Sequence, residues 1–280
     1  MRLTSDVLKL NLSSVEARIK RFIRDYVKKC GANGVVLGMS GGVDSSTIAA
    51  VAALALGGDA VLGIALPEEE MYNVTDVQHA KRVVRKFGFK LENIDISPIL
   101  RLYFQSLPVY DATDKLSKGN LKARTRMTCL YYYANRLNKL VCGSSDKSET
   151  MIGYFTKWGD VAADISPLMD LYKTQIRQLA HHIGVPKEIV TKPSTPALWP
   201  GHVAEEELGI KYETLDLILF GLEHFMTPED IAEQLNLPVK LVAEVKKRWL
   251  ANEHKRRLPL TVKLGYRTVG FDFRLPYSLR

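Results

Sequence analysis

The sequence of 280 residues has few cysteines and lacks a long hydrophobic run. Cys30, Cys129 and Cys142 form no Cys-x-x-Cys pair, which argues against a disulfide framework and against a structural zinc site. The longest apolar stretch, around residues 48–56, is far shorter than the roughly 20 residues of a membrane span, and the N-terminus carries no export signal. These absences predict reduced cysteines and a cytoplasmic location, with no membrane partner.

Neither hydrophobic nor charged residues dominate the composition. They make up 46% and 25% of the chain, ordinary values that exclude a mostly disordered, collagen-like or coiled-coil protein. Lys and Arg number 39 against 31 Asp and Glu, and the resulting charge of +8 is compatible with a nucleotide or nucleic-acid partner but is also common in proteins with neither. The basic residues concentrate late in the chain, at Lys246, Lys247, Arg248, Lys255, Arg256, Arg257, Lys263, Arg267 and Arg274.

The hydrophobic pattern predicts strands that alternate with helices. Buried strands in this arrangement indicate an α/β, Rossmann-like fold, in which a doubly wound parallel sheet has helices on both faces. Ligands of such sheets bind at the carboxyl ends of the strands, so we expect chemistry in the loops after Met39, Leu66 and Val141. The expected strands are 34–39, 60–66, 91–96 and 140–143, and the expected helices between them are 13–29, 43–56, 74–87 and 120–137.

The second half of the sequence predicts helices without matching strands. Residues 192–201 contain three prolines and a tryptophan with no periodicity, which predicts a loop that covers a substrate. The expected later helices are 172–183, 212–225, 228–235 and 238–254. We therefore predict a single domain over 1–280, with a nucleotide-binding core at about 12–190, a covering loop at 191–210, and a helical and basic C-terminal part at 211–280.

The sharpest motif lies between the first predicted strand and the next helix. Its glycines let backbone amides approach a phosphate, and the helix N-terminus adds a favourable dipole. A Walker loop would need Gly-Lys followed by Ser or Thr, and a dinucleotide fingerprint would need Gly-x-Gly-x-x-Gly, so both are excluded. The motif therefore predicts a cradle for an anion, built by Gly38, Met39, Ser40, Gly41, Gly42, Val43, Asp44 and Ser45.

The pattern Ser-Gly-Gly-x-Asp-Ser resembles the pyrophosphate loop of the ATP pyrophosphatases, which split ATP into AMP and pyrophosphate while they activate a carboxylate or carbonyl oxygen. Segments 120–127, 143–149 and 153–160 closely resemble the signature stretches of NAD synthetase. The resemblance runs in register from about residue 15 to residue 255. The chain is identified in this way as a member of the ammonia-dependent NAD synthetases.

This resemblance implies ATP-dependent amidation of deamido-NAD by ammonia, through an acyl-adenylate, with release of AMP and pyrophosphate. It also implies that Asp44 and Glu149 hold Mg²⁺, for which carboxylate oxygens are suitable ligands. Ser144, Lys173 and Thr195 match family positions that contact ATP. Two alternatives stay open. Glu149 could be a glutamate near a helix N-terminus that interacts favourably with the helix dipole, and Ser144 could cap a helix that begins near Asp146.

A second set of residues matches family positions around deamido-NAD and ammonia. Asp160 lies where the family binds ammonia, and a carboxylate there could accept its proton. Solvated charges on a loop or a helix are the alternative for all members of the set. The positions expected to contact deamido-NAD are Arg124, Lys157, Asp164, His254 and Lys255.

The covering loop departs from the family pattern. The family often has Pro-Thr-Ala-Asp-Leu where this chain has residues 194–198, including Thr195 and Ala197. Ala204 precedes Glu205 where an Asp-Glu pair is common.

The resemblance also implies partners. A homodimer is expected, and the helix with Tyr131, Tyr132 and Tyr133 could be part of its interface or part of the core. Free ammonia is the expected nitrogen source, because the family pattern begins within about fifteen residues of Met1 and no cysteine has the context of a glutaminase nucleophile.

Two other functions are alternatives to this one. Another ATP pyrophosphatase could sulfurate or amidate a different substrate, but paired cysteines that would favour sulfuration are absent. A nucleic-acid-binding protein would need an aromatic platform or a helix-turn-helix signature, and neither is found, so no nucleic-acid partner is expected. His181 and His182 lack metal-ligand partners at suitable spacing and are expected at the surface.

Overall fold

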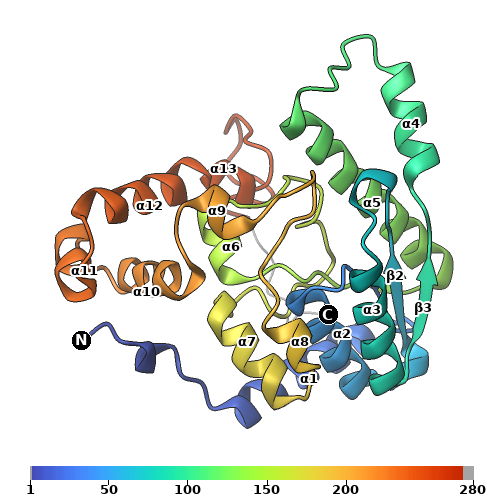
Figure 1. The fold of residues 1–280 in the computed structure, drawn as a ribbon, viewed down its shortest axis with the longest axis horizontal. Coiled ribbons are helices and arrows are strands. Elements are labelled where there is room, and N and C mark those ends of the chain that lie inside the picture. Colours follow the sequence, from blue (N-terminus) through green and yellow to red (C-terminus); the bar gives the residue numbers. More distant parts are fainter. Residues whose placement is uncertain (1, 274–280) are drawn as a thin grey trace.

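Four short parallel strands form the centre of the fold, which a computed structural model describes for residues 2–273 (Figure 1). They are β1 (Val35–Gly38), β2 (Val61–Ala65), β3 (Lys90–Asn93) and β4 (Leu140–Val141). Their order is β3-β2-β1-β4, and Val35 of β1 lies opposite both Val61 and Leu140. The chain therefore builds outward from β1 and returns to its other side, which places the switch point of the sheet between β1 and β4. Arg274 and the rest of the predicted basic part beyond residue 273 lie outside the described residues.

One face of the sheet is covered by α1 (Leu12–Lys29), α2 (Val43–Leu56), α3 (Val74–Phe87), α7 (Lys173–His182) and α8 (Lys187–Val190). The alanine-rich helix α2 contacts α1, α3 and α7, so nearly all of its side chains are buried. By contrast, α1 buries Ile19, Ile23 and Val27, which are spaced four residues apart and lie on one side of the helix.

The opposite face is covered by α4 (Ser97–Ser106) and α5 (Lys115–Leu137). Both faces are therefore covered, which confirms the predicted doubly wound α/β fold. Helix α5 begins earlier than predicted because Asp114 caps it and accepts a hydrogen bond from the backbone N–H of Ser117. Helix α4, which was not predicted, and the first turns of α5 project beyond the sheet as an arm (Figure 1).

The predicted C-terminal helices build a second core beside the sheet. They are α10 (Tyr212–Glu223), α11 (Pro228–Leu235), α12 (Val239–Ala251) and α13 (Glu253–Arg256). Leu3 and Leu8, at the N-terminal 3₁₀ helix η1 (Ser5–Leu8), are buried in this core. The N-terminal segment thereby packs against the C-terminal helices. The periodicity of the sequence does not predict this contact.

Several boundaries differ from the prediction. The expected helix 238–254 is two helices because Asn252 breaks it, and its side chain donates to the carbonyl of Ile152 at 2.9 Å. Residues 192–201 contain no helix, as expected, but the short helix α9 (Ala204–Leu208) lies within the predicted covering loop. The helix expected near Asp146 is α6 (Lys147–Ile152). The 3₁₀ helices η2 (Gly58–Ala60) and η3 (Glu69–Met71) were not predicted. Every helix within residues 2–273 is too short or too polar to span a bilayer.

Candidate active site

The glycine loop after β1 is shaped by two hydroxyl groups and one glycine. The hydroxyls of Ser40 and Ser45 lie 2.9 Å apart, and Ser45 Oγ donates to the carbonyl of Gly42 at 3.2 Å. Gly41 has φ of 76°, and a Cβ there would lie 2.5 Å from the carbonyl oxygen of Asp76, so only glycine fits. Gly42 then caps α2 without a side chain, which leaves the first N–H groups of the helix available to an anion.

The other predicted loop residues anchor the loop to the core of the sheet and to α2. Gly38 ends β1, Met39 is buried and donates its backbone N–H to the carbonyl of Ile64, and Val43 is the buried first residue of α2. With Met39 and Val43 buried, any contact of these residues with a ligand would come from the backbone.

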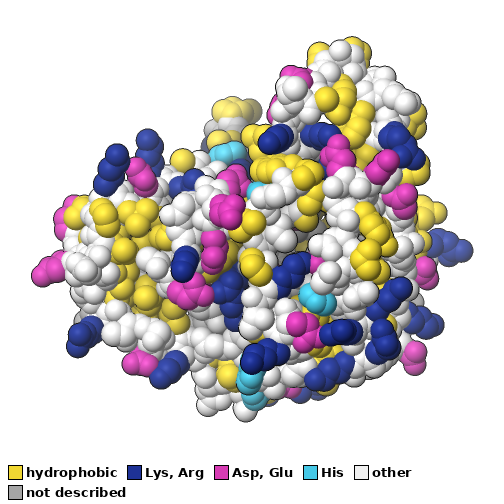
Figure 2. All heavy atoms as spheres, in the orientation of Figure 1, with side chains coloured by type: hydrophobic (Ala, Val, Ile, Leu, Met, Phe, Trp, Pro, Cys, Tyr) yellow, Lys and Arg dark blue, Asp and Glu magenta, His cyan; other side chains and the backbone are white. Residues whose placement is uncertain are grey.

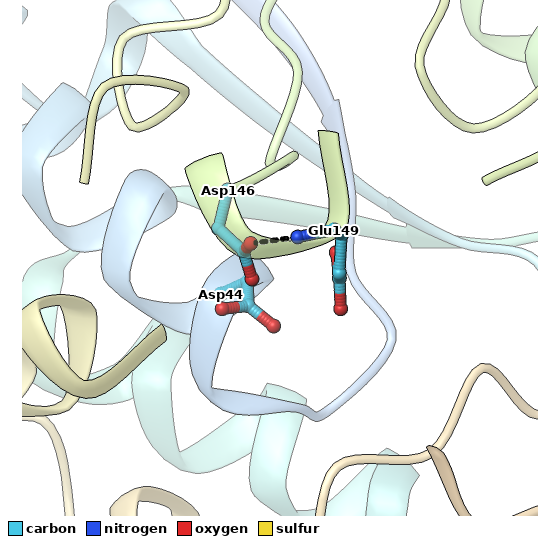
Figure 3. A group of neighbouring side chains, drawn as sticks. All are labelled: Asp44, Asp146 and Glu149. Carbon is cyan, nitrogen blue, oxygen red and sulfur yellow. Dashed lines mark hydrogen bonds between the residues drawn. The ribbon is translucent and has the colours of Figure 1, made fainter. Parts of the chain in front are cut away.

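Three carboxylates converge beside the glycine loop (Figure 3). Asp44 belongs to the first turn of α2, whereas Asp146 and Glu149 lie at the start of α6, shortly after β4. One oxygen from each carboxylate lies within 4.8 Å of the other two. Asp146 caps α6 by accepting a hydrogen bond from the backbone N–H of Glu149 at 2.7 Å, which fixes both side chains at the helix start. The predicted pair is thus brought together, and Asp146 completes what we call the carboxylate cluster.

Lys173 joins this cluster from the start of α7. Its side chain is fully buried, and its Nζ lies 2.8 Å from Asp44 Oδ2, 2.6 Å from Asp146 Oδ2 and 2.9 Å from Glu149 Oε1. Sequence reasoning assigned Lys173 to the ATP phosphates, and that contact stays a prediction. In the structure, Lys173 balances one of the three negative charges.

The pKa values of the cluster respond to burial and to one another. Burial and the charge of Asp146 raise the pKa of Glu149 to about 8, against the opposing effect of Lys173. Burial likewise raises the pKa of Asp146. Burial alone would lower the pKa of Lys173, but the charges of Asp146, Asp44 and Glu149 raise it well above its ordinary value. A cation bound here would therefore have to displace protons from the carboxylates.

The cluster fits a divalent cation such as Mg²⁺. Three ionised carboxylates and one ammonium group leave a charge of −2 in a partly buried position, and carboxylate oxygens are ligands that Mg²⁺ prefers. Asp44 Oδ1 is buried and has no hydrogen-bond partner among residues 2–273. An oxygen without a donor is expensive to bury unless a cation compensates it.

Ser144 lies between β4 and α6 and is partly buried. The alternative that it caps the following helix is wrong, because Asp146 performs this function. Ser144 is thus left beside the switch point of the sheet, and its predicted contact with adenosine stays a prediction.

The segment that follows α6 carries Lys157 and Asp160. The Oδ1 of Asp160 accepts the backbone N–H of Thr156 at 2.7 Å, and the side chain keeps solvent-accessible surface. Surrounding protein atoms nevertheless raise the pKa of Asp160, although the hydrogen bond and the charge of Lys255 oppose the shift. Arg124 on α5 is exposed and donates through Nε and Nη2 to the carbonyl of Lys157, at 3.3 and 3.2 Å. Arg124, Lys157 and Asp160 therefore belong to one region of the surface.

The remaining predicted residues around deamido-NAD have structural contacts of their own. Asp164 accepts the backbone N–H of Val141 at 2.7 Å and so continues the edge of the sheet beyond β4. Lys255 donates to the carbonyls of Gly153 and Phe155 at 2.8 and 3.0 Å, which links α13 to the segment after α6. His254 is exposed beside it. Their contacts with substrate stay predictions.

The covering loop is attached to the site by a buried lysine. Lys122 on α5 donates to Glu68 at 2.7 Å, to Glu70 at 2.7 Å and to the carbonyl of Leu198 at 3.2 Å. Lys122 is therefore buried, because this part of α5 faces the protein interior. The hydroxyl of Thr195 is used within the loop, where it donates to the carbonyl of His202.

Sequence reasoning missed two groups of the cluster. Asp146 has a recognisable signal, because an Asp followed three residues later by Glu after a strand is typical of a helix start. Tyr212 on α10, whose hydroxyl donates to Glu149 Oε1 at 3.2 Å, has no such signal, since it lies 63 residues further along the chain.

Other sequence expectations concern residues away from the cluster. Burial raises the pKa of the Cys142 and Cys129 thiols, and all three cysteines are free, as expected. His181 and His182 are exposed, also as expected. Of the three tyrosines on α5, Tyr131 and Tyr133 pack against the core and Tyr132 is exposed.

Charged side chains of both signs gather in the middle of one face of the molecule, between the C-terminal helices and the sheet (Figure 2). Apolar side chains are visible on the projecting arm in the same view. A strongly polar recess is the expected environment for nucleotides, whereas an apolar arm is better suited to a protein contact.

The family model for NAD synthase matches residues 15–259. The NH(3)-dependent NAD(+) synthetase of Hyperthermus butylicus is 46% identical over 261 residues, which cover 92% of this chain and 94% of that protein. Among solved structures, NMN synthetase from Francisella tularensis matches with a TM-score of 0.81 and 30% identity, over 91% of this chain and 100% of that one. The NH3-dependent NAD synthetase from Campylobacter jejuni matches with a TM-score of 0.76 and 28% identity, over the same shares.

These comparisons establish the family of the chain. The resemblance to this family predicted the glycine loop and the pair Asp44 and Glu149, which lie close together in the structure. The family model covers most of the chain, and the relative is similar over nearly its whole length. The chain therefore belongs to the NAD synthase family, which are ligases of NAD biosynthesis.

Proposed function

We propose that the chain converts deamido-NAD to NAD with ATP and ammonia. An oxygen of the nicotinate carboxylate attacks the α-phosphorus of ATP, and the bond to pyrophosphate breaks. Ammonia then attacks the acyl carbon of this acyl-adenylate, loses a proton, and AMP leaves with the bonding electrons. The observation that carries the proposal is the carboxylate cluster beside the glycine loop, in a chain of the NAD synthase family.

The residues of the glycine loop bind ATP in this proposal. The free N–H groups at the start of α2 and the backbone of residues 38–42 donate to the phosphates. Ser144, Lys173 and Thr195 complete the ATP site, with Lys173 shared between the cluster and the phosphates. Asp44, Asp146 and Glu149 would hold Mg²⁺, which when bound supplies positive charge to the triphosphate.

Asp160 is the proposed catalytic residue of the second step. Ammonia is protonated at neutral pH much as lysine is, so a base must accept its proton before or during attack. The raised pKa of Asp160 suits it to accept that proton, and its accessible surface allows ammonia to approach. Arg124, Lys157, Asp164, His254 and Lys255 are proposed to bind deamido-NAD.

The proposal also names the nitrogen source and the nucleotide that accepts the nitrogen. Free ammonia is proposed because the curated relative of similar length is named for its dependence on NH3. A second candidate substrate is the acid form of NMN, since an NMN synthetase also shares this fold over its whole length. The acceptor is then a mononucleotide instead of a dinucleotide, and the chemistry is the same.

One assay separates these possibilities. Purified protein is incubated with ATP, magnesium and ammonium, together with either deamido-NAD or the acid form of NMN, and the products are identified by mass spectrometry. We expect NAD, AMP and pyrophosphate, with a higher kcat/KM for the dinucleotide. ADP and phosphate would contradict the mechanism. Efficient synthesis with glutamine in ammonia-free buffer would contradict the nitrogen source.

We also propose that the chain forms a homodimer through the arm. Leu102 and Leu116 are exposed on this arm, and Val109 at its tip is 90% exposed, which is costly in water unless a second copy covers them. Tyr132, which lies on α5 with Leu116, is exposed as well. Light scattering should give a dimer for the wild type and a monomer for Val109→Glu combined with Leu102→Glu. A fully active wild-type monomer at micromolar concentration would refute the dimer.

A further inference from the structure

Arg126 is a partly buried arginine whose donors are mostly unused. It lies on α5, and its Nε donates to the carbonyl of Leu66, just beyond β2, at 3.1 Å. Among residues 2–273, neither Nη atom of Arg126 has a hydrogen-bond acceptor or an ion-pair partner. Burial lowers the pKa of this guanidinium, and only the more remote charges of Glu68 and Asp160 act in the opposite direction.

Three other cations within residues 2–273, two buried and one partly buried, have acceptors for their donors. Lys122 contacts two carboxylates and a carbonyl, and Lys173 contacts three carboxylates. Arg256 donates to three carbonyls and to Glu253. Arg126 differs from these residues because its Nη donors have no partner in the described part of the protein and keep accessible surface, so they are open to an anionic ligand.

The neighbours of Arg126 place its side chain at the carboxyl edge of the sheet. Leu130, one turn later on α5, lies over Gly38 at the end of β1, 3.6 Å from where a Cβ would be. Ala123, one turn earlier, packs against Gly159, which precedes Asp160. Arg126 therefore lies between the ends of β1 and β2 and the segment that carries the proposed base for ammonia.

We propose that Arg126 binds the nicotinate carboxylate of deamido-NAD and thereby distinguishes this acid from the amide product. The inference rests on the proposed function. The two Nη atoms of a guanidinium match the two oxygens of a carboxylate, whereas a carboxamide offers one oxygen and no negative charge. Conversion of the acid to the amide removes the charge that Arg126 holds, which favours release of NAD.

The test measures binding of three ligands to wild-type protein and to variants, by isothermal titration calorimetry. Arg126→Gln removes the charge, and Arg126→Lys keeps the charge but not the fork. Arg136→Gln, an exposed position near the end of the same helix, is the matched control. The ligands are deamido-NAD, NAD, and an ATP analogue that cannot be cleaved. Circular dichroism verifies the fold of each variant, and Arg126→Lys serves if Arg126→Gln does not fold.

We expect Arg126→Gln to weaken binding of deamido-NAD by about tenfold to a hundredfold, as for the loss of a charge-assisted pair of hydrogen bonds. Binding of NAD should change by less than about threefold, so the preference for acid over amide is lost. The affinity of Arg126→Lys for deamido-NAD should lie between those of the wild type and Arg126→Gln. The affinity of Arg136→Gln should match that of the wild type.

Three results would overturn the inference. Equal weakening of deamido-NAD and NAD would mean that Arg126 only supports the structure. A loss confined to the ATP analogue would assign the same anion-binding chemistry to a phosphate. Full retention of the acid preference in Arg126→Gln would mean that Arg126 does not contact the carboxylate. If the wild type fails to make NAD at all, the proposed function itself is wrong, which the variants do not decide.

Discussion

Magnesium binding to the carboxylate cluster is expected to release protons. Glu149 has a pKa of about 8 in the cluster without a metal, because burial and the charge of Asp146 oppose its ionisation. A carboxylate must be ionised to serve as a metal ligand. At pH 7 a group with this pKa is protonated to about 0.9, so each Mg²⁺ should release about 0.9 proton from Glu149. Burial also raises the pKa of Asp146.

The same linkage sets the pH dependence of metal affinity. For one group with a pKa of about 8, the apparent affinity rises about tenfold between pH 7 and pH 9, which is about 1.4 kcal/mol. Proton release is measured with a pH-indicator dye in weakly buffered protein while MgCl₂ is added, and the titration curve gives the affinity. Glu149→Gln should release fewer protons, whereas Glu233→Gln, an exposed carboxylate on α11, should match the wild type. Magnesium binding without proton release, at an affinity independent of pH, would refute the reasoning.

Further expectations follow from the same contacts. Asp44→Ala and Glu149→Ala should each abolish turnover with unchanged circular dichroism, and near wild-type activity at millimolar magnesium would show that the metal site is misplaced. Burial raises the pKa of Asp216 to about 6, and burial together with the charge of Asp146 raises the pKa of Glu149 to about 8, so the folded state binds protons that the unfolded chain has released. The Tm of metal-free protein should therefore fall as pH rises from about 5 to 8, and magnesium should restore it; a rising Tm would contradict these shifts. Lys122→Met leaves a buried carboxylate unpaired and should lower the free energy of unfolding by about 3–5 kcal/mol in urea titrations, against about 0–1 kcal/mol for Lys118→Met, whose partner is exposed, and equal effects would be inconsistent with the buried pair.

Local periodicity predicted the elements whose burial repeats at short spacing. The predicted bounds of α2, α3 and α11 agree with the structure, because each helix has a glycine, asparagine or proline at its ends that fixes where it starts or stops. Helix α6 has only six residues, too few for periodicity to reveal it. The glycine loop was also predictable, because the glycines that let the backbone approach a phosphate are consecutive in the sequence.

The candidate site was predictable only in part, because its charges are compensated over long separations. A lysine on a helix with Arg124 and Arg126 resembles a solvated charge in sequence, yet Lys122 is buried against Glu68, 54 residues away. Lys173 likewise meets Asp44 at a separation of 129 residues. No window of sequence contains both partners of such a pair, so burial of these cations follows from the tertiary fold alone.

The carboxylate cluster and Arg126, two incompletely compensated sites within residues 2–273, lie on opposite sides of the central strand. The carboxylate cluster has an excess of negative charge, and its members Asp146 and Glu149 follow β4. Arg126 has unused positive donors and lies beside Leu66, which follows β2. Because β1 lies between β2 and β4, the glycine loop that ends β1 separates the two. A carboxylate held by Arg126 would then face the phosphates on the glycine loop from the side opposite the metal ligands. Attack on the α-phosphorus requires the nucleophile and the departing pyrophosphate on opposite sides of the phosphorus atom, and a carboxylate held by Arg126 would meet this requirement with the pyrophosphate on the side of the metal ligands.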